Sequence, residues 1–506
     1  MTSPRGRRWF ASCLALLVSW QPAGAEDSAA ETVLLDLDTA LRMAVTNNLT
    51  IRRGGLLPEA GRQRVREEGG AFDPAVELSR NRTSDTGARP LDPFGARPPA
   101  SRVLVDDHEA VVRGLLPSGG NYRAGLSSRN LRGTFNSFAD DYYTFLGVSI
   151  TQPLLRSAGP ASALAALRLA RIERAGHEWR YRQVVIDTVT ATALAYFELV
   201  RSRDSLRVAE RSRELGEQLV RDNERRRERG AMSVQDVVEA RARAARRHDM
   251  MLAARLDAAA AENDLKRLIY ADFASVERLR LETRDTVVEV PGDTELRKAM
   301  DAALEARPDY QLASIEVQQR SIELGLARNR ALPAVDLVAS YGYNGNDGSF
   351  SESLTRVRER ESESYSVGAI VSVPIPNRSG RARRRIATLE LERSELVLDD
   401  FAQEVKRQLT DARYAIEVNR ERVAASRNAR ALAARSLEAE EKRLRAGTST
   451  TFLVLEQQDS LAEAELREAR AVADLAAAVA EFFRLAGRSL DAFHIDPAIV
   501  HDGQLR

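Results

Sequence analysis

Residues with the chemistry to catalyse a reaction or to hold a metal are few and scattered in this chain. The five histidines lack the spacing of metal ligands, and the single cysteine, Cys13, lies in an N-terminal apolar run. No glycine-rich loop precedes a lysine, so nothing indicates a site for ATP phosphates. We therefore expect no catalytic residue, no cofactor and no metal site. We expect the histidines to be ordinary surface residues: His108, His177, His248, His494 and His501.

The first 25 residues have the pattern of a cleaved secretory signal. Three arginines precede an apolar run from Trp9 to Trp20, and Ala23-Gly24-Ala25 supplies the small residues of a cleavage site. That run is too short to span a membrane, and no later run looks apolar enough for a transmembrane helix. The 75 basic and 74 acidic residues nearly balance, and loss of the leader arginines leaves about −2. This balance argues against a nucleic-acid partner.

The clearest local feature is a helix–turn–helix segment that occurs twice. The segment 443–487 begins RLRAGTSTTFLVLEQQ. It aligns without a gap with the segment 217 residues earlier, which begins RRERGAMSVQDVVEAR. Gly447 suits the left-handed position that ends a helix, and Gly230 matches it. Thr448 and Ser449 are candidate N-caps of the returning helix. The returning helix carries apolar residues at coiled-coil spacing: Val472, Leu475, Val479, Phe482 and Ala486.

A second pair of segments matches at a shift of 259 residues. The segment 44–78 aligns with the segment 303–337, and both contain Pro-Ala-Val. The chain is therefore two copies of one unit of helix, strands, long helix, turn and helix. The two shifts differ by 42, so the first copy holds that many extra residues between its matched ends.

The predicted strands alternate an apolar face with a small or polar face. Val335 to Tyr343 and Tyr365 to Val373 show this most clearly, and six of the eleven tyrosines fall in strand regions. This pattern is typical of a transmembrane β-barrel, and too few strands are present for one chain to close it. The alternative is a soluble α/β protein with a buried sheet. In the barrel interpretation Val335, Leu337, Val367 and Val371 face lipid.

The chain resembles the TolC-like outer membrane efflux proteins, the outer membrane factors of tripartite export systems. The resemblance covers nearly the whole chain beyond the leader and rests on the duplicated halves, on QPLLRSAG and PIPNRSGRARRR after two of the strands, and on the second hairpin tip. It implies an α+β membrane protein in which long helical hairpins form a periplasmic tunnel and strands join a shared trimeric barrel. It also implies a homotrimer in outer-membrane lipid, with a periplasmic adaptor and an inner-membrane transporter as partners.

This resemblance suggests a division of the chain into nine parts. They are a signal peptide (1–25), a helix (26–71), barrel strands with an extra hairpin (72–151), a long helical hairpin (152–270), an equatorial region (271–294), a helix (295–332), barrel strands (333–376), a second long hairpin (377–487) and an equatorial tail (488–506). The family normally gives four strands per chain to a 12-stranded barrel. The extra hairpin at 103–128 departs from that pattern, and we expect it to join the sheet rather than fold beside it.

The resemblance also assigns roles to the hairpin tips. The positions that match the adaptor-contacting tips are Arg229, Gly230, Ala231, Ala446, Gly447 and Thr448; as an alternative, the glycines only end their helices. The positions that match the entrance gate are Asp236, Glu239, Ser449, Leu453 and Glu456. Leu453 stands where some relatives carry an acidic residue, and Ser449 where they carry an arginine that pairs with the aspartate. The cargo is not readable from the chain, and a periplasmic scaffold without transport is the alternative function.

Overall fold

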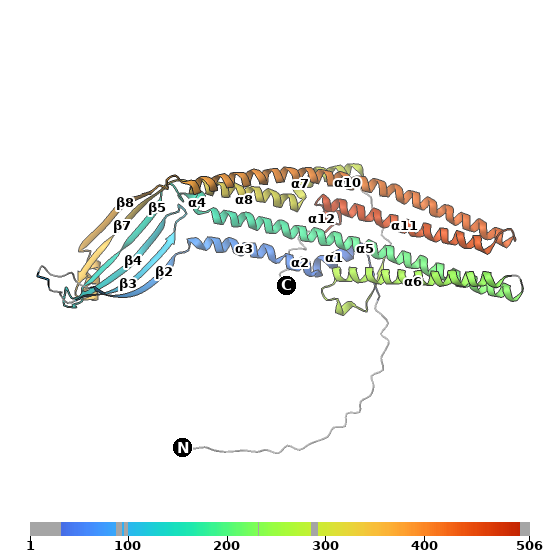
Figure 1. Ribbon diagram of the computed structural model, residues 1–506, viewed down its shortest axis with the longest axis horizontal. Coiled ribbons are helices and arrows are strands. Elements are labelled where there is room, and N and C mark those ends of the chain that lie inside the picture. The colour runs from blue at the N-terminus through green and yellow to red at the C-terminus, as the bar shows by residue number, and fades with distance from the viewer. Residues whose placement is uncertain (1–31, 88–93, 96–99, 231, 285–291, 496–506) are drawn as a thin grey trace, which may run out of the picture.

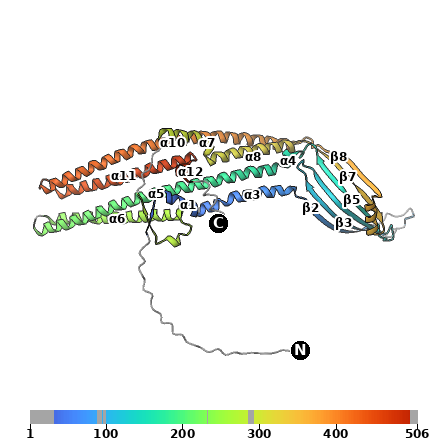
Figure 2. The same ribbon diagram turned by 180° about the vertical axis from the view of Figure 1, so that it is seen from behind.

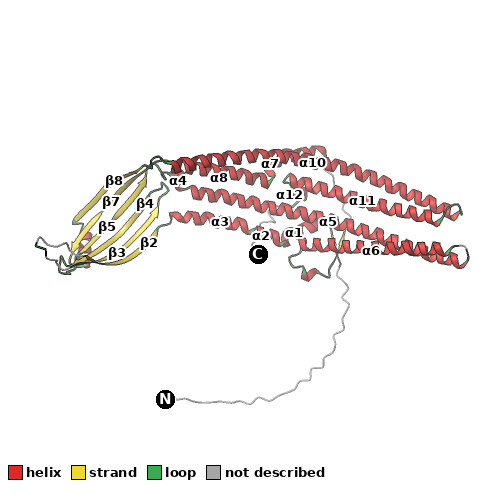
Figure 3. Ribbon diagram, in the orientation of Figure 1, coloured by secondary structure: helices red, strands yellow, loops and turns green. Residues whose placement is uncertain are grey.

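The structure is a computed structural model that describes residues 32–87, 94–95, 100–230, 232–284 and 292–495. The signal-peptide prediction and two of the residues singled out above, Ala231 and His501, lie outside these ranges. The described chain is elongated, with a β-sheet at one end and two long helical hairpins at the other (Figures 1 and 2). One long helix of each hairpin begins next to the sheet, and shorter helices run beside the first part of these long helices (Figure 3).

The two predicted long hairpins are present. The first consists of α5 (Ala165–Glu228) and α6 (Val234–Ile269), and the second of α10 (Arg378–Arg445) and α11 (Thr451–Leu485). The 68 residues of α10 extend over roughly 100 Å at 1.5 Å per residue. A short separate helix, α4 (Pro160–Ala163), lies between the preceding strand and α5. The two hairpins lie side by side and end together, as the sequence duplication predicts.

The hairpins pack around two apolar cores, and the first core also includes Ala476 and Ala480 of α11 (Thr451–Leu485). The first core joins α5 and α6 to α1 (Leu37–Asn47), around the fully buried Tyr196 and Leu265. The second joins α10 and α11 to α7 (Asp293–Ala306). The predicted coiled-coil seam is confirmed, because Leu475, Val479, Phe482 and Ala486 are buried in the second core and Val472 packs against it.

The sequence was predicted to contain no run apolar enough for a transmembrane helix after the leader, but one part of α5 is apolar enough. An 18-residue window of this helix reaches a mean hydropathy of 1.3, which by length and composition is enough to cross a membrane. However, 56% of that window is buried inside the chain. Packing against the first core therefore accounts for its apolar character.

Two segments predicted to be mostly helical are divided into several elements. The segment 26–71 contains β1 (Thr32–Leu35), which pairs in parallel with β6 (Arg280–Thr283), before α1, α2 (Leu49–Gly54) and α3 (Leu56–Gly69). The segment 295–332 is broken between α7 and α8 (Pro308–Arg330). The break falls at Arg307, whose ψ of 120° is the extended conformation that a following proline favours. Short helical pieces complete this part of the chain: η1 (Gly70–Phe72), η2 (Ala274–Val276) and α12 (Ser489–Ala492).

The main sheet has six antiparallel strands in the order β2-β3-β4-β5-β7-β8. Their bounds are β2 (Ala75–Gly87), β3 (Ser101–Leu115), β4 (Asn121–Gly133), β5 (Tyr142–Pro153), β7 (Ala334–Asp347) and β8 (Ser362–Ser372). The shortest has 11 residues, enough to cross a bilayer when tilted. The connection between β7 and β8 contains a helix, α9 (Phe350–Glu359), capped by Ser349.

Candidate functional site

One face of the six-stranded sheet is apolar across all six strands in the half nearer the helices. Farther from the helices, the same face of β2, β3 and β4 is charged, and Asp106 lies 3.5 Å from Arg82 and 2.5 Å from Arg132. Residues that lie opposite one another in successive strands form a row: Val76, Val112, Ala124, Val148, Tyr341 and Tyr365. Val367 and Val371 are exposed on this face, at 72% and 65%. Leu337 and Val335 share the face, because they lie opposite Ala369 and Val371. The four residues predicted to face lipid therefore lie on one surface that the chain itself leaves uncovered.

The opposite face of the sheet is polar and charged. On β2, β3 and β4, Arg113 and Arg123 lie 3.1 Å and 3.8 Å from Glu77. Arg123 also lies 3.2 Å from Glu109. Across β5, β7 and β8 this face carries small polar residues, including Ser149, Ser340 and Ser366 in one row. Charged groups of this kind are costly in contact with lipid, so this face suits an aqueous lumen.

Both hairpin tips turn through a glycine in the left-handed conformation. Gly230 has a φ of 73° and Gly447 a φ of 74°, as the sequence predicts for Gly447. A Cβ atom added at either glycine would meet nothing within 4 Å. The cost of a substitution there is therefore backbone strain, not steric overlap with a neighbour.

The helices that return from the tips have different caps from those predicted. Thr450, rather than Thr448 or Ser449, caps α11 by accepting a hydrogen bond from the Leu453 N–H at 3.4 Å. Thr448 instead donates its hydroxyl to the Arg443 carbonyl at 3.2 Å, and Ser449 donates to Glu440. Cap choice depends on the exact length of the turn, which the duplication alone does not fix.

Asp236 belongs to the cap of α6. Its N–H donates to the Ser233 hydroxyl at 3.1 Å, and its carboxylate accepts from the Ser233 N–H at 3.2 Å. This reciprocal arrangement is a capping box. Asp236, Glu239 and Ser449 nevertheless line one cavity of about 300 Å³ between the two tips. Leu453 and Glu456 lie outside that lining and are exposed.

Two arginines of α6 join the first hairpin to the second near the tips. Arg247, only 6% exposed, lies 2.6 Å from Asp459 of α11. Arg243 lies 4.0 Å from the same carboxylate and stacks 4.7 Å above the ring of Phe452. Arg243 also lies 3.0 Å from Glu239, so this glutamate, unlike Glu456, has a cationic partner among the described residues. We call Arg243, Arg247, Phe452 and Asp459 the inter-hairpin contact.

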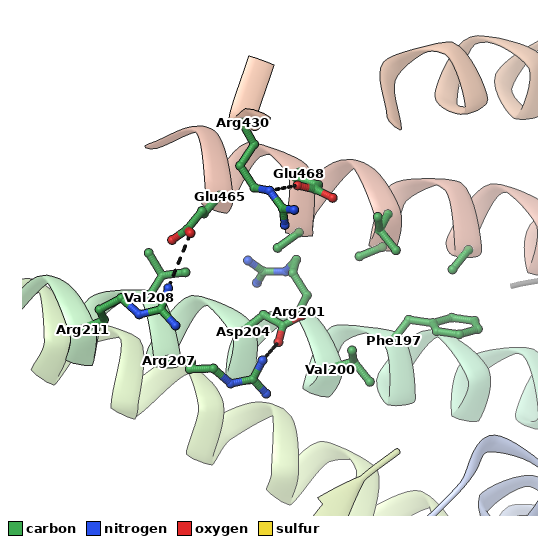
Figure 4. Close-up of a pocket in the computed structure, with 14 residues that line it drawn as sticks. Phe197, Val200, Arg201, Asp204, Arg207, Val208, Arg211, Arg430, Glu465 and Glu468 are labelled. Carbon is green, nitrogen blue, oxygen red and sulfur yellow. Dashed lines mark ion pairs between the residues drawn. The ribbon is translucent and has the colours of Figure 1, made fainter. Parts of the chain in front are cut away.

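Further from the tips, a cavity of about 270 Å³ lies between α5 and α11 (Figure 4). Arg211 of α5 reaches across to Glu465 of α11 at 3.6 Å. Arg430 of α10 pairs with Glu468 at 3.1 Å. The first pair joins the two hairpins, and the second joins the two helices of the second hairpin. Among the described residues, no group of three or more His, Cys, Asp or Glu is placed to hold a metal ion.

The sequence model of the outer membrane efflux protein family matches residues 117–269 and 299–488. The chain belongs to this family. The match covers both long hairpins, β5 and the β7–β8 pair. It starts at residue 117, within the turn of the extra β3–β4 hairpin. A sequence search of curated proteins finds no match.

Solved structures share the fold of this outer membrane efflux protein. The CmeC outer membrane channel of Campylobacter jejuni gives a TM-score of 0.66 at 15% identity, over 90% of this chain and 86% of that one. VceC of Vibrio cholerae gives 0.63 at 15% identity, over 90% and 95%. The open state of the MtrE channel of Neisseria gonorrhoeae gives 0.61 at 16% identity, over 90% and 89%. Family and neighbours are channels, and the chain is an outer-membrane protein with a large periplasmic part.

The inter-hairpin contact was missed by reasoning from this efflux protein's sequence. In the alignment of the two repeats, Arg247 corresponds to Ala464, so the second hairpin has no charged residue at the equivalent position. The contacts join α6 to α11, which are more than 200 residues apart in the chain. No local pattern signals such a pair. The available signal was weaker: basic residues at 243 and 247 are spaced to share one face of a helix.

Proposed function

We propose that this protein is the outer membrane exit duct of a tripartite export system, passive in itself and coupled to a periplasmic adaptor and an inner-membrane pump. The observation that carries the proposal is the placement of the sheet. In the half nearer the helices its apolar face is uncovered across six strands, whereas α9 packs on the far end of this face at Thr144. Four of the six strands connect directly to helices that run away from the sheet. Such a chain can cross the outer membrane and continue as a periplasmic tunnel when three copies assemble.

The hairpin tips are the part of the duct we assign to adaptor contact and closure. At the far end from the sheet lie Arg229, Gly230, Ala446, Gly447 and Thr448. Ala231, which is outside the described residues, is part of the same assignment. In an envelope-spanning assembly this end reaches furthest into the periplasm. The tip residues are exposed, which supports their availability to a partner.

Glu456 is the residue we assign to the periplasmic entrance as a charge filter. It is exposed and makes no ion pair among the described residues, whereas Glu239 pairs with Arg243. Three copies of Glu456 around a threefold axis would attract cations into a constriction. Asp236 and Ser449 cannot form the ion pair that the resemblance gives for some relatives, because the serine hydroxyl carries no charge, and Asp236 caps its own helix. Closure is assigned instead to the inter-hairpin contact.

Glu456→Gln is expected to lower the cation selectivity of the channel in planar bilayers and to weaken block by trivalent cations. Glu239→Gln is the matched control, because its carboxylate is already offset by Arg243 and its loss should change selectivity less. Equal selectivity in wild type and Glu456→Gln would place the filter elsewhere.

The whole proposal is tested by assembly and by export. Crosslinking in membranes should trap three chains, and a strain that lacks the protein should lose export of its pump's cargo. Gly230→Val with Gly447→Val should abolish export while the trimer still forms, because a β-branched residue is strongly disfavoured at positive φ. Gly230→Asn with Gly447→Asn is the control, since asparagine tolerates that conformation. A water-soluble monomer, as expected of a scaffold, would refute the proposal.

A further inference from the structure

The extra hairpin, β3 and β4, is an integral part of the sheet. β2 pairs with β3 from Ala75 to Gly87, and β4 pairs with β5 from Asn121 to Asn130. The hairpin therefore lies between β2 and β5 and is not folded over either face. Its turn is fixed to the neighbouring strand, where the Gly159 N–H donates to the Ser118 carbonyl at 2.9 Å and Gln152 donates to the same carbonyl at 3.1 Å.

In the half of the sheet nearer the helices, both faces continue through this hairpin without a change of character. On the apolar face, Val112 and Ala124 of the hairpin stand between Val76 of β2 and Val148 of β5. On the charged face, Arg123 of the hairpin bridges Glu77 and Glu109. A hairpin plugging the lumen would have no need for an apolar face that matches its neighbours. The facing therefore places β3 and β4 in the wall of the barrel.

The edges of the sheet are β2 and β8, which have no partner strand on their outer sides among the described residues. Backbone groups at an open edge cannot be left unpaired in the hydrocarbon region of a bilayer. The edge strands of one chain must therefore pair with those of another copy, β8 of one beside β2 of the next. This step depends on the trimer of the proposed function.

We infer that three copies close a barrel of 18 strands, six from each chain. Only four of the six strands of each chain connect to a helix of the tunnel. β2, β5, β7 and β8 connect to helices, whereas β3 and β4 are joined to each other by the 116–120 turn and have none beneath them. Barrel diameter grows roughly in proportion to strand number, so the exit is about 1.5 times as wide as one built from four strands per chain. Barrels of this size hold an aqueous channel, here walled by arginine, glutamate and serine.

Thiol labelling in membranes tests where the hairpin lies, using a Cys13→Ser background that removes the chain's only cysteine. Leu126 and Ser127 are neighbours on β4 that face opposite sides of the sheet. We expect a water-soluble maleimide to label Ser127→Cys and to leave Leu126→Cys unlabelled. Labelling of both by the aqueous reagent would show a hairpin in the lumen or outside the membrane and would overturn the inference.

Excision of the hairpin tests the width. Deleting residues 88–141 joins β2 to β5 and keeps their apolar faces aligned, because Val76 and Val148 already occupy one row. The shortened chain should still form trimers. The largest poly(ethylene glycol) that enters from the extracellular side should fall by about a third in diameter. An unchanged exclusion size in a crosslinked trimer overturns the 18-stranded barrel alone, whereas loss of the full-length trimer overturns the proposed function. If the excised chain does not assemble, the strand count in an electron-microscopy reconstruction of the full-length trimer decides.

Discussion

Replacement of Val367 by arginine is expected to prevent assembly in the outer membrane. Val367 lies at the middle of β8, on the apolar face, and is 72% exposed. Arginine at the midplane of a lipid-facing strand costs ~2–4 kcal/mol. Each trimer would carry three such residues, so the folded, inserted form should largely disappear. The measurement is the heat-modifiable trimer band in outer-membrane fractions.

Ser366→Arg is the control for this experiment. Ser366 is the neighbouring residue on the same strand and faces the polar side, where it hydrogen-bonds Ser340 at 2.8 Å. An arginine there would extend into water beside other polar groups, so trimers should form at close to the normal level. If both variants assembled equally, or if only Ser366→Arg failed, the assignment of the two faces would be reversed.

Removal of the Asp459 carboxylate is expected to open the periplasmic entrance. Asp459→Ala deletes the partner of Arg247 and Arg243, which hold α6 to α11. Hydrogen bonds to charged groups contribute about 1.5–3 kcal/mol, and Asp459 is half exposed, so solvent places this contact near the lower limit. About 1.4 kcal/mol corresponds to a tenfold shift toward the open form. Single-channel recordings should show a higher open probability, and cells should admit antibiotics that are otherwise excluded.

Glu463→Ala is the matched variant for the entrance. Glu463 lies on α11 about one turn beyond Asp459, and within the described part of the chain its one ion pair is with Arg467 of the same helix, at 3.0 Å. Its loss removes the same charge without separating the hairpins. Equal open probabilities for Asp459→Ala and Glu463→Ala would show that the inter-hairpin contact does not hold the entrance closed.

Much of the architecture follows from local patterns in the sequence. The repeat of 217 residues predicts two equivalent hairpins, and the structure has them with a left-handed glycine at each tip. Alternation along β7 and β8 predicts which side chains share the apolar face, because successive residues of a strand point to opposite sides. Periodicity along α11 predicts its buried seam. These features depend on residues that are close together in the chain.

Other local features were not predictable with the same accuracy. Thr450 caps α11 in place of the predicted Thr448 or Ser449, and α9 lies within the connection between β7 and β8. Short helices and caps depend on small differences in local energy, which the surrounding packing settles. Ser353 of α9, for example, is buried against Thr144 of β5, and their hydroxyls lie 2.7 Å apart.

The sequence by itself determined the class of the protein, its duplication, its hairpin turns and the facing of its strands, because helix and strand periodicity act over a few residues. The tertiary structure confirmed that β3 and β4 enter the sheet, and it alone decided that β1 pairs with β6 and that Arg243 and Arg247 meet Asp459. Each of these requires segments distant in the chain to come together, and the free energy that selects such contacts arises from packing and desolvation in the folded state.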